Sequence, residues 1–339
     1  MKQILWFRRD LRVNDSAILS FAKDEVLPIF IFDKNILDKL QEDDKRVTFI
    51  YKSVLKLKED LKNLGLDLAV FYSTPKEVFE GFKNQGFDSV LCSVDFDDYA
   101  KKRDEEIAKI IPMQTFFDSF ITHPNDCLKA DKTPYKVFTP YYNNLKFIWN
   151  SYRLEEFETN KNLKLIPFDF DSIPTLENMG FIKQTLPDFL QKNPDELLKD
   201  FEQKIDNYKI DRDFFDKNAT SNLAVHLRFG LLSPRQIFNK IKVFKARNEN
   251  KEFFVRELFW REFYNYILFH FPKSETSNLN EIKVNWNEDE TIFQKWCEGN
   301  TGVPIIDSAM RHFNLTGTMH NRLRMIVSSY LTKNLLVDW

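Results

Sequence analysis

Residues 3–12 read Gln3-Ile4-Leu5-Trp6-Phe7-Arg8-Arg9-Asp10-Leu11-Arg12, a short apolar run followed by a charged one. Further apolar runs lie at 26–32, 68–72, 89–92 and 113–117. Between them, residues 43–64, 75–83 and 99–110 carry apolar side chains at helical spacing. Short apolar strands that alternate with amphipathic helices predict a doubly wound parallel sheet, an α/β fold of Rossmann-like architecture. The fingerprint GxGxxG does not follow the first run, so the pattern gives no sign of a nicotinamide dinucleotide in the usual place.

The second half of the chain has a different pattern. Between residues 123 and 199 the periodicity fades and prolines accumulate, which predicts a long surface linker between two domains. Beyond residue 200 we expect helices at 223–230, 234–247, 251–269, 293–298, 305–313 and 320–339. The sequence thus predicts an α/β domain at 1–122, a linker at 123–199 and an all-α domain at 200–339. Because the chain ends at Trp339 with no cap or polar tail, we expect this helical domain to be incomplete at its C-terminal end.

Composition narrows the class of protein. The net charge is −2, so nucleic-acid binding would need a local basic patch. Cys92, Cys127 and Cys297 are widely spaced and form no CxxC pair, which argues against a disulfide framework and a zinc site, and we expect no metal. The sequence contains no signal peptide and no apolar run near the roughly 20 residues of a membrane span. We therefore expect a cytoplasmic monomer that does not associate with membranes.

One stretch near the end, Gly317-Thr318-Met319-His320-Asn321-Arg322-Leu323-Arg324-Met325-Ile326-Val327, predicts a helix with two faces. One face is apolar, and the other carries polar side chains together with Met325. No acidic residue occurs between Asp307 and Asp338, and two arginines on one short helix suit a phosphate group. An ordinary solvated helix explains the pattern equally well, so spacing alone leaves both interpretations open.

Three motifs together resemble the DNA photolyase/cryptochrome family. They are Trp6–Arg12, Glu257–Tyr264, and the pair Thr301–Asp307 with Met319–Met325. Weaker similarity occurs at 134–140 and 230–235, and the resemblance spans the whole chain in the family's order. It implies an N-terminal α/β domain able to hold an antenna chromophore, either folate or deazaflavin, and a helical domain that binds FAD. It also implies a light-driven carbon–carbon lyase that acts on DNA containing cyclobutane pyrimidine dimers, by electron transfer from excited reduced FAD to a dimer flipped out of the helix.

The resemblance also implies a set of flavin-binding residues. In the phosphate segment and around the flavin these are Tyr208, Thr220, Ser221, Asn222, Leu223, Ala224, Phe254, Arg261, Asn321 and Arg324. Ala224 stands where the family usually has serine, and Phe254 replaces an aromatic residue that is commonly tryptophan. A plain helix N-cap at Thr220 and Ser221 is the alternative explanation of this segment.

The substrate side implied by the resemblance comprises Glu257, Trp260, Arg261, Tyr264, Asn321, Arg322 and Met325. A carboxyl group at Glu257 can hydrogen-bond a thymine, and the Trp260 indole can stack on a flipped base. Relatives that repair (6-4) photoproducts have histidines at the positions of Asn321 and Met325, so the resemblance favours cyclobutane dimers. Without it, a surface pair between Glu257 and Arg261 beside a core Trp260 would be the simpler interpretation.

Two tryptophans match the family's electron relay. Trp286 corresponds to its distal member and Trp339 to its middle member, and we count both with Glu257 as catalytic candidates. Each could equally be an ordinary packed aromatic residue. Two other functions stay open from the sequence: a cryptochrome-like blue-light photoreceptor that binds the same flavin, and a non-catalytic fragment.

Overall fold

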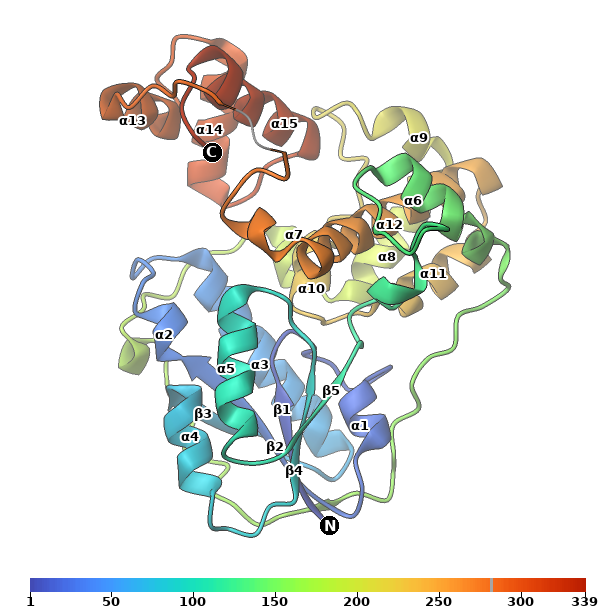
Figure 1. Cartoon of the computed structure of the whole chain (residues 1–339), viewed down its shortest axis with the longest axis vertical. Coiled ribbons are helices and arrows are strands. Elements are labelled where there is room, and N and C mark those ends of the chain that lie inside the picture. The colour runs from blue at the N-terminus through green and yellow to red at the C-terminus, as the bar shows by residue number, and fades with distance from the viewer. Residues whose placement is uncertain (281–282) are drawn as a thin grey trace.

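The computed structural model describes residues 1–280 and 283–339, and Figure 1 shows an α/β body that holds the N-terminus next to a helical body. The α/β body is built on five parallel strands in the order β3-β2-β1-β4-β5. Their bounds are Lys2–Phe7 (β1), Glu25–Asp33 (β2), Ala69–Ser73 (β3), Ser89–Ser93 (β4) and Met113–Phe116 (β5). The doubly wound parallel sheet predicted from the apolar runs is confirmed.

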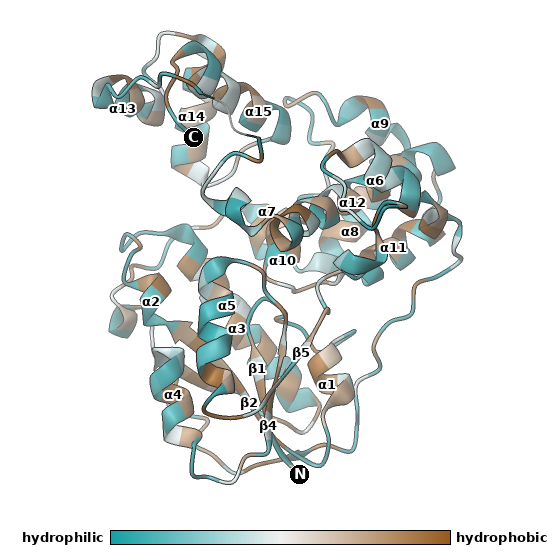
Figure 2. Cartoon of the chain, viewed as in Figure 1, coloured by the Kyte–Doolittle hydropathy of each residue, from teal (hydrophilic) through white to brown (hydrophobic). Residues whose placement is uncertain are grey.

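Helices cover both faces of this sheet because side chains along each strand alternate between them. Leu5 and Phe7 of β1 pack with α1 (Ala17–Phe21) and α3 (Lys45–Asn63). Ile4 and Trp6 pack instead with α4 (Pro75–Phe82) and α5 (Asp98–Ala108). Figure 2 shows the mostly hydrophilic outer surface of α5 over the sheet. The short helices α1 and α2 (Lys34–Leu37) were not predicted, since one turn of helix carries too little periodicity to recognise.

The predicted surface linker is wrong for much of its length. The segment contains α6 (Phe138–Leu145), a 3₁₀ turn at Lys146–Asn150, α7 (Asp188–Gln191) and α8 (Pro194–Glu202). Phe138, Tyr141, Leu145 and Trp149 are buried in the core of the helical body. Residues Lys164–Leu165 form β6, which pairs with β2 in the α/β body. The prolines around these elements obscured a helical spacing that does bury apolar residues.

The helical body is organised around α12 (Asn248–His270), which packs against α6, α9 (Tyr208–Asp211) and α11 (Pro234–Val243). The short α10 (Ala224–Arg228) precedes α11. Helices α13 (Glu290–Glu298), α14 (Pro304–Thr316) and α15 (Asn321–Ser329) form a smaller apolar cluster of their own around Ile306, Met310 and Val327. A helix at 320–339 was expected, but α15 passes into a π-helical turn at Tyr330–Asn334 and the last residues are not helical. Within residues 1–280 and 283–339, no helix has the length and apolar character needed to cross a bilayer.

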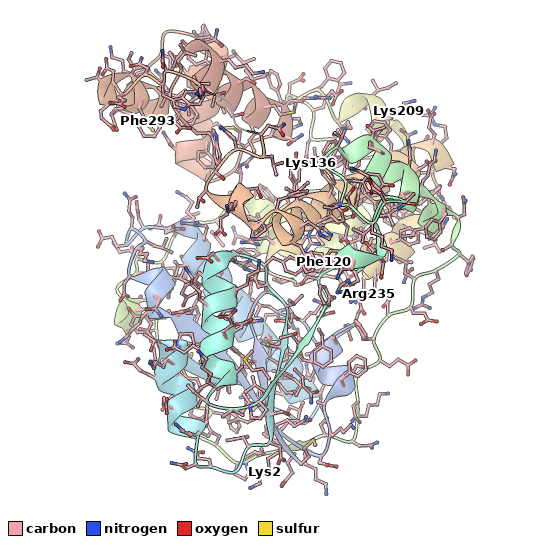
Figure 3. All side chains as sticks on the ribbon, in the orientation of Figure 1. Lys2, Phe120, Lys136, Lys209, Arg235 and Phe293 are labelled. Atoms are coloured by element: carbon pink, nitrogen blue, oxygen red, sulfur yellow. The ribbon has the colours of Figure 1, made fainter. Side chains whose placement is uncertain are left out.

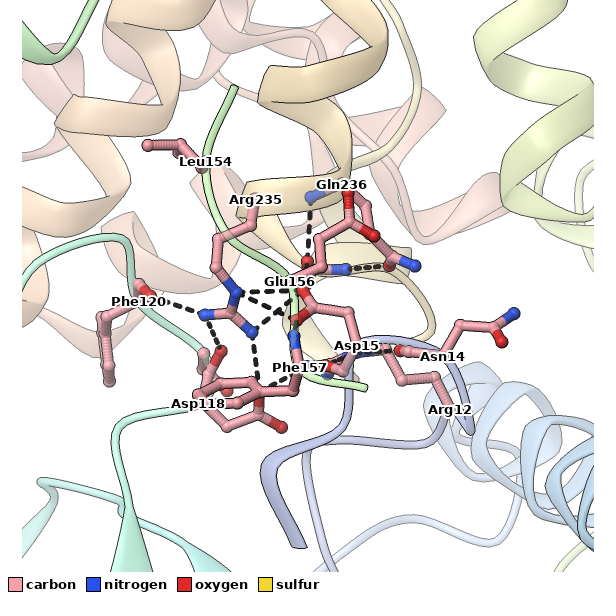
Figure 4. Close-up of polar contacts among 12 residues, drawn as sticks. Arg12, Asn14, Asp15, Asp118, Phe120, Leu154, Glu156, Phe157, Arg235 and Gln236 are labelled. Carbon is pink, nitrogen blue, oxygen red and sulfur yellow. Dashed lines mark hydrogen bonds and ion pairs between the residues drawn. The ribbon is translucent and has the colours of Figure 1, made fainter. Parts of the chain in front are cut away.

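A buried ion cluster joins the two bodies, and Figure 4 shows it in detail. The guanidinium of Arg235, at the start of α11, donates from Nε to both carboxylate oxygens of Asp15, at 3.1 and 3.0 Å. Its Nη2 donates to Asp118 Oδ1 at 2.8 Å, and its Nη1 donates to the carbonyl oxygens of Asp118 and Phe120. Both aspartate side chains are fully buried. Figure 3 places Arg235 and Phe120 close together where the two bodies meet.

Arg12 completes the cluster from the motif after β1. Its Nη2 donates to Asp118 Oδ1 at 2.6 Å and its Nη1 to the carbonyl of Gly230 at 3.2 Å. Gly230 has φ +69°, and a Cβ there would lie 2.1 Å from the carbonyl oxygen of Arg9. Only glycine allows the backbones of the two bodies to approach this closely.

We expect Arg235→Ala to lower the free energy of unfolding by about 3–5 kcal/mol, because it leaves buried carboxylates without their partner. Urea unfolding at neutral pH measures the change. Arg153→Ala is the matched control, since Arg153 is 65% exposed and pairs with Glu156 at 3.4 Å. Arg153→Ala should lower the free energy of unfolding by less than about 1 kcal/mol. Equal losses in the two variants would contradict a structural role for the buried cluster.

Candidate functional site

A cavity of about 400 Å³ opens on the helical body between α9, α10, α12 and the start of α15. Helix α12 provides one wall, because Phe254, Glu257, Leu258, Arg261 and Asn265 follow one another at spacings of one, three and four residues along one broad face of the helix.

Most of the predicted site residues line this cavity although they lie far apart in the sequence. They are Tyr208, Thr220, Ser221, Leu223, Ala224, Phe254, Glu257, Arg261, Asn321 and Arg322. Segments 208–224, 254–261 and 321–322 therefore meet at one place. This convergence is what the resemblance led us to expect of a ligand site.

Other predicted residues do not line the cavity: Asn222, Trp260, Tyr264, Arg324, Met325, Trp286 and Trp339. Asn222 adjoins the cavity-lining Ser221 and adopts a left-handed backbone conformation with φ +57°, which asparagine tolerates better than most residues. The ring of Trp260 stacks on Phe138 at a centroid distance of 3.6 Å and an angle of 9°. Met325 on α15 is half exposed.

The two relay candidates lie in segments that pair with each other outside the cavity lining. The backbone N–H of Asn287, next to Trp286, donates to the carbonyl of Leu336 at 2.6 Å, which pairs this segment with the one that ends at Trp339. The Trp339 indole donates to Asn278 Oδ1 at 3.0 Å, and its side chain is 60% exposed.

Several lining residues were missed by sequence reasoning: Arg212, Asp213, Leu227, Arg228, Leu258, Asn265 and His320. Arg212 carried a usable signal, because it follows Tyr208 by four residues, the spacing of neighbours on one helical face. His320 stood in the quoted stretch, where it caps α15 by accepting the N–H of Arg322 at Nδ1. Burial lowers the pKa of His320, which favours the neutral ring.

A chain of alternating charges crosses one end of the cavity. Glu257 forms an ion pair with Arg212, the Nε of Arg212 lies 3.6 Å from Asp213, and Asp213 pairs with Arg322 at 2.8 Å. The simple surface pair between Glu257 and Arg261 is not what the structure shows. Arg261 instead donates to the carbonyl of Ser119 at 2.6 Å.

The segment 220–224, which the resemblance assigns to the flavin phosphates, has two residues with hydroxyl groups beside the cavity. Neither Thr220 nor Ser221 is the N-cap residue of α10, which is Leu223. Both hydroxyl groups nevertheless have local partners, because Ser221 Oγ accepts the N–H of Leu223 at 3.4 Å and Thr220 Oγ1 donates to Asn222 Oδ1 at 3.2 Å. Thr220 and Ser221 line the cavity together with Arg228 and Arg261. Within the described part of the chain Arg228 forms no ion pair. Hydroxyl and guanidinium donors suit a pyrophosphate, and the rings of Tyr208 and Phe254 suit a flat aromatic group, so this donor set fits FAD.

Glu262 lies behind the cavity and is 3% exposed. Its Oε2 accepts the backbone N–H groups of Ile121 and Thr122 at 3.0 and 3.4 Å, and its Oε1 lies 3.6 Å from the guanidinium of Arg261. Burial raises the pKa of Glu262 to about 7, against the opposing effect of Arg261 and the two backbone donors. This carboxyl group therefore changes charge near neutral pH directly beside a cavity-lining arginine.

We expect Glu262 to destabilise the fold as the pH rises from about 5 to about 7. Its pKa in the folded state is about 7, above the reference value of 4.5, so the folded state holds a proton that the unfolded state has released in that window. Glu262→Gln should remove this decline, which amounts to about 3 kcal/mol because one pKa unit corresponds to about 1.4 kcal/mol.

Urea unfolding at pH 5, 6, 7 and 8 measures this pH dependence. Glu249→Gln on the same helix is the control, because Glu249 is exposed and its pKa is lowered by its hydrogen bond with Lys209. The control should keep the wild-type decline between pH 5 and 7. A Glu262→Gln variant with an unchanged decline would contradict the assignment.

Comparisons with known proteins agree with this geometry. Residues 3–159 match the family model for DNA photolyase, and residues 254–339 match the model for the FAD binding domain of DNA photolyase. The deoxyribodipyrimidine photo-lyase of Alkalihalophilus pseudofirmus is 31% identical over 99% of this chain and 74% of its own length. That of Synechococcus is 27% identical over 99% of this chain and 75% of its own length.

Solved structures show the same likeness. A class III photolyase from Agrobacterium tumefaciens superimposes with a TM-score of 0.83 at 28% identity, covering all of this chain and 74% of that one. A photolyase from Sulfolobus tokodaii with two FAD molecules has a TM-score of 0.83 at 28% identity, and the match covers 100% of this chain and 76% of that one. A cryptochrome from Synechocystis has a TM-score of 0.85 at 22% identity, and the match covers 100% of this chain and 76% of that one. This last likeness concerns the fold alone.

Proposed function

The chain belongs to the DNA photolyase/cryptochrome family and carries that family's FAD-binding domain, and from this premise we propose that it repairs cyclobutane pyrimidine dimers in DNA under blue light. The observation that carries the proposal is the convergence of segments 208–224, 254–261 and 321–322 on one cavity. FAD, when bound, supplies the absorption of light and the electron that opens the dimer. The chain's own residues bind the cofactor, receive the dimer and shield both from water.

The residues that line the cavity suggest which of them would bind the cofactor and which would bind the dimer. Thr220, Ser221, Arg228 and Arg261 would hold the pyrophosphate of FAD, because they combine hydroxyl and guanidinium donors. Glu257 would accept a hydrogen bond from a thymine N–H, with Arg212 fixing its carboxylate.

Asn321, exposed at the start of α15, would offer an amide to the same base. An amide at Asn321 and a thioether at Met325 cannot act as proton-donating acids, which supports cyclobutane dimers over (6-4) photoproducts as the substrate.

Trp286 and Trp339 would carry electrons from the surface toward the cofactor. The hydrogen bond between Asn287 and Leu336 supports this role, since it joins their two segments. The distal candidate Trp286 is partly exposed, and the middle candidate Trp339 is 60% exposed. Both tryptophans lie outside the cavity lining. Their task would therefore be to reduce the flavin and not to bind the dimer.

We expect Trp286→Phe to block photoreduction of oxidised flavin while leaving repair intact once the flavin has been reduced by dithionite, because the relay acts before repair. Glu257→Ala should do the reverse, with photoreduction preserved and repair reduced. The assay is repair of a thymine-dimer oligonucleotide under blue light, with and without dithionite. If the wild-type protein binds FAD and photoreduces it but repairs nothing under either condition, the chain is a photoreceptor and the proposed repair function is wrong.

A second test concerns the cofactor alone. Thr220→Ala combined with Ser221→Ala should weaken FAD binding about tenfold to a hundredfold, since a hydrogen bond to a charged group contributes roughly 1.5–3 kcal/mol. Ala224→Ser should strengthen it by restoring the hydroxyl that the family usually has. Ser277→Ala, on an exposed turn, is the control and should change nothing. Quenching of FAD fluorescence on titration with protein gives the affinity. Unchanged affinity in the double variant would place the phosphates elsewhere.

A further inference from the structure

Asp213 lies between two arginines at the cavity, in the place that a bound anion would take. It follows α9, in the turn that leads to the segment 220–224. Its Oδ1 accepts a hydrogen bond from the Nε of Arg322 at 2.9 Å, and the Nη2 of Arg322 lies 2.8 Å from the same oxygen. The Nε of Arg212 lies 3.6 Å from that oxygen as well. Two guanidinium groups from distant segments therefore face one carboxylate oxygen.

The contact with Arg322 can be broken at little cost, because water reaches both side chains. Asp213 is 45% exposed and Arg322 is 41% exposed. Ion pairs at such positions contribute little, since solvent screens the charges. Arg212, at 13% exposed, keeps a second carboxylate partner in Glu257. Among the residues that the structure describes, Arg322 pairs with Asp213 alone. Displacing Asp213 would thus leave Arg322, and not Arg212, without a counterion.

The edge of Arg322 that faces Asp213 also suits a phosphate. Its Nε and Nη2 donors form a fork that matches the oxygens of a carboxylate or of a phosphate. Arg322 lies in the first turn of α15, which contains no acidic residue of its own, and the amino-terminal end of a helix favours an anion nearby. Asp213 supplies that anion from another segment. A phosphate of a DNA strand at the cavity mouth would carry a charge of the same sign and meet the same donors.

We propose that Asp213 is a resident substitute for a DNA phosphate: it holds Arg322 in the free protein, and a phosphate of the bound strand displaces it. The inference rests on the proposed function, which brings a DNA strand to the cavity. Every DNA must break the pair and place a phosphate near the freed carboxylate, so Asp213 lowers the affinity for all DNA. Undamaged DNA offsets this cost with backbone contacts alone, whereas a dimer adds contacts inside the cavity. Asp213 therefore keeps the protein from being held on undamaged DNA.

A purely structural role for the pair would have the opposite consequence. The contact joins the turn after α9 to α15, and these two parts of the helical body belong to separate apolar clusters. If the pair served to hold α15 over the cavity, removing the charge of Asp213 would loosen α15 and weaken DNA binding. If Asp213 competes with phosphate, the same change strengthens DNA binding. The sign of the effect separates the two roles.

Asp213→Asn tests the competition, because it keeps the shape of the side chain and removes its charge. The FAD-loaded protein is titrated against an undamaged duplex and a duplex with one thymine dimer, and fluorescence anisotropy gives both affinities. We expect both affinities to rise by about threefold to tenfold at low salt, the effect of one exposed charge a few ångströms from a phosphate. The gain should shrink at higher salt. In an Arg322→Ala background the same change should have little effect, because the two residues act through one contact.

Asp216→Asn is the matched control, since Asp216 is exposed, lies three residues further on and forms no ion pair within residues 1–280 and 283–339. It removes the same charge and should change either affinity by less than about twofold. Equal gains for the two variants, a gain that survives Arg322→Ala, or weaker binding by Asp213→Asn would each overturn the inference. The proposed function is judged separately, on the wild-type protein: it fails if that protein binds the dimer duplex no better than the undamaged one.

Discussion

The buried ion cluster around Arg235 is the interaction on which the arrangement of the site depends. Removing Asp15 and Asp118 from water carries a cost that only well-placed cations and hydrogen bonds offset. Arg235 and Arg12 supply them from the two bodies. Asp118 pairs with Arg12 inside the α/β body, but the cation that pairs with Asp15 is Arg235, which opens α11 in the helical body. The cluster therefore fixes one relative placement of the two bodies.

That placement extends to the cavity through the loop after β5. Asp118 and Phe120 offer their carbonyl groups to Arg235, and the carbonyl of Ser119, between them, accepts from Arg261. The next two residues donate their N–H groups to Glu262. Five successive residues, 118–122, are thus bound either to the ion cluster or to α12. An arginine that borders the cavity is held by the α/β body, so the cavity wall depends on both bodies although only residues of the helical body line it.

Sequence patterns predicted the parts of this structure that repeat a simple period. Parallel strands buried on both faces read as continuous apolar runs, so the five strands of the main sheet could be found with nearly correct bounds. The helix at 138–145 was hidden because Pro140 lies in its first turn, and the stacking of Trp260 on Phe138 could not be foreseen because Phe138 lies more than a hundred residues earlier. The resemblance named most of the cavity residues, yet Asp213 could be recognised only once α9, α12 and α15 were seen to meet. Contacts between residues far apart in the sequence determine such positions, and the spacing of residues along the sequence cannot reveal those contacts.

Two groups of charged residues at the cavity differ in how their charge is balanced. Glu257, Arg212, Asp213 and Arg322 alternate in sign and neutralise one another. The carboxylate that faces Arg261 is Glu262, whose raised pKa weakens it as a counterion near neutral pH. The positive charge left there is available to an anionic ligand. The first group leaves little net charge at the cavity, whereas the guanidinium of Arg261 keeps most of its charge near neutral pH.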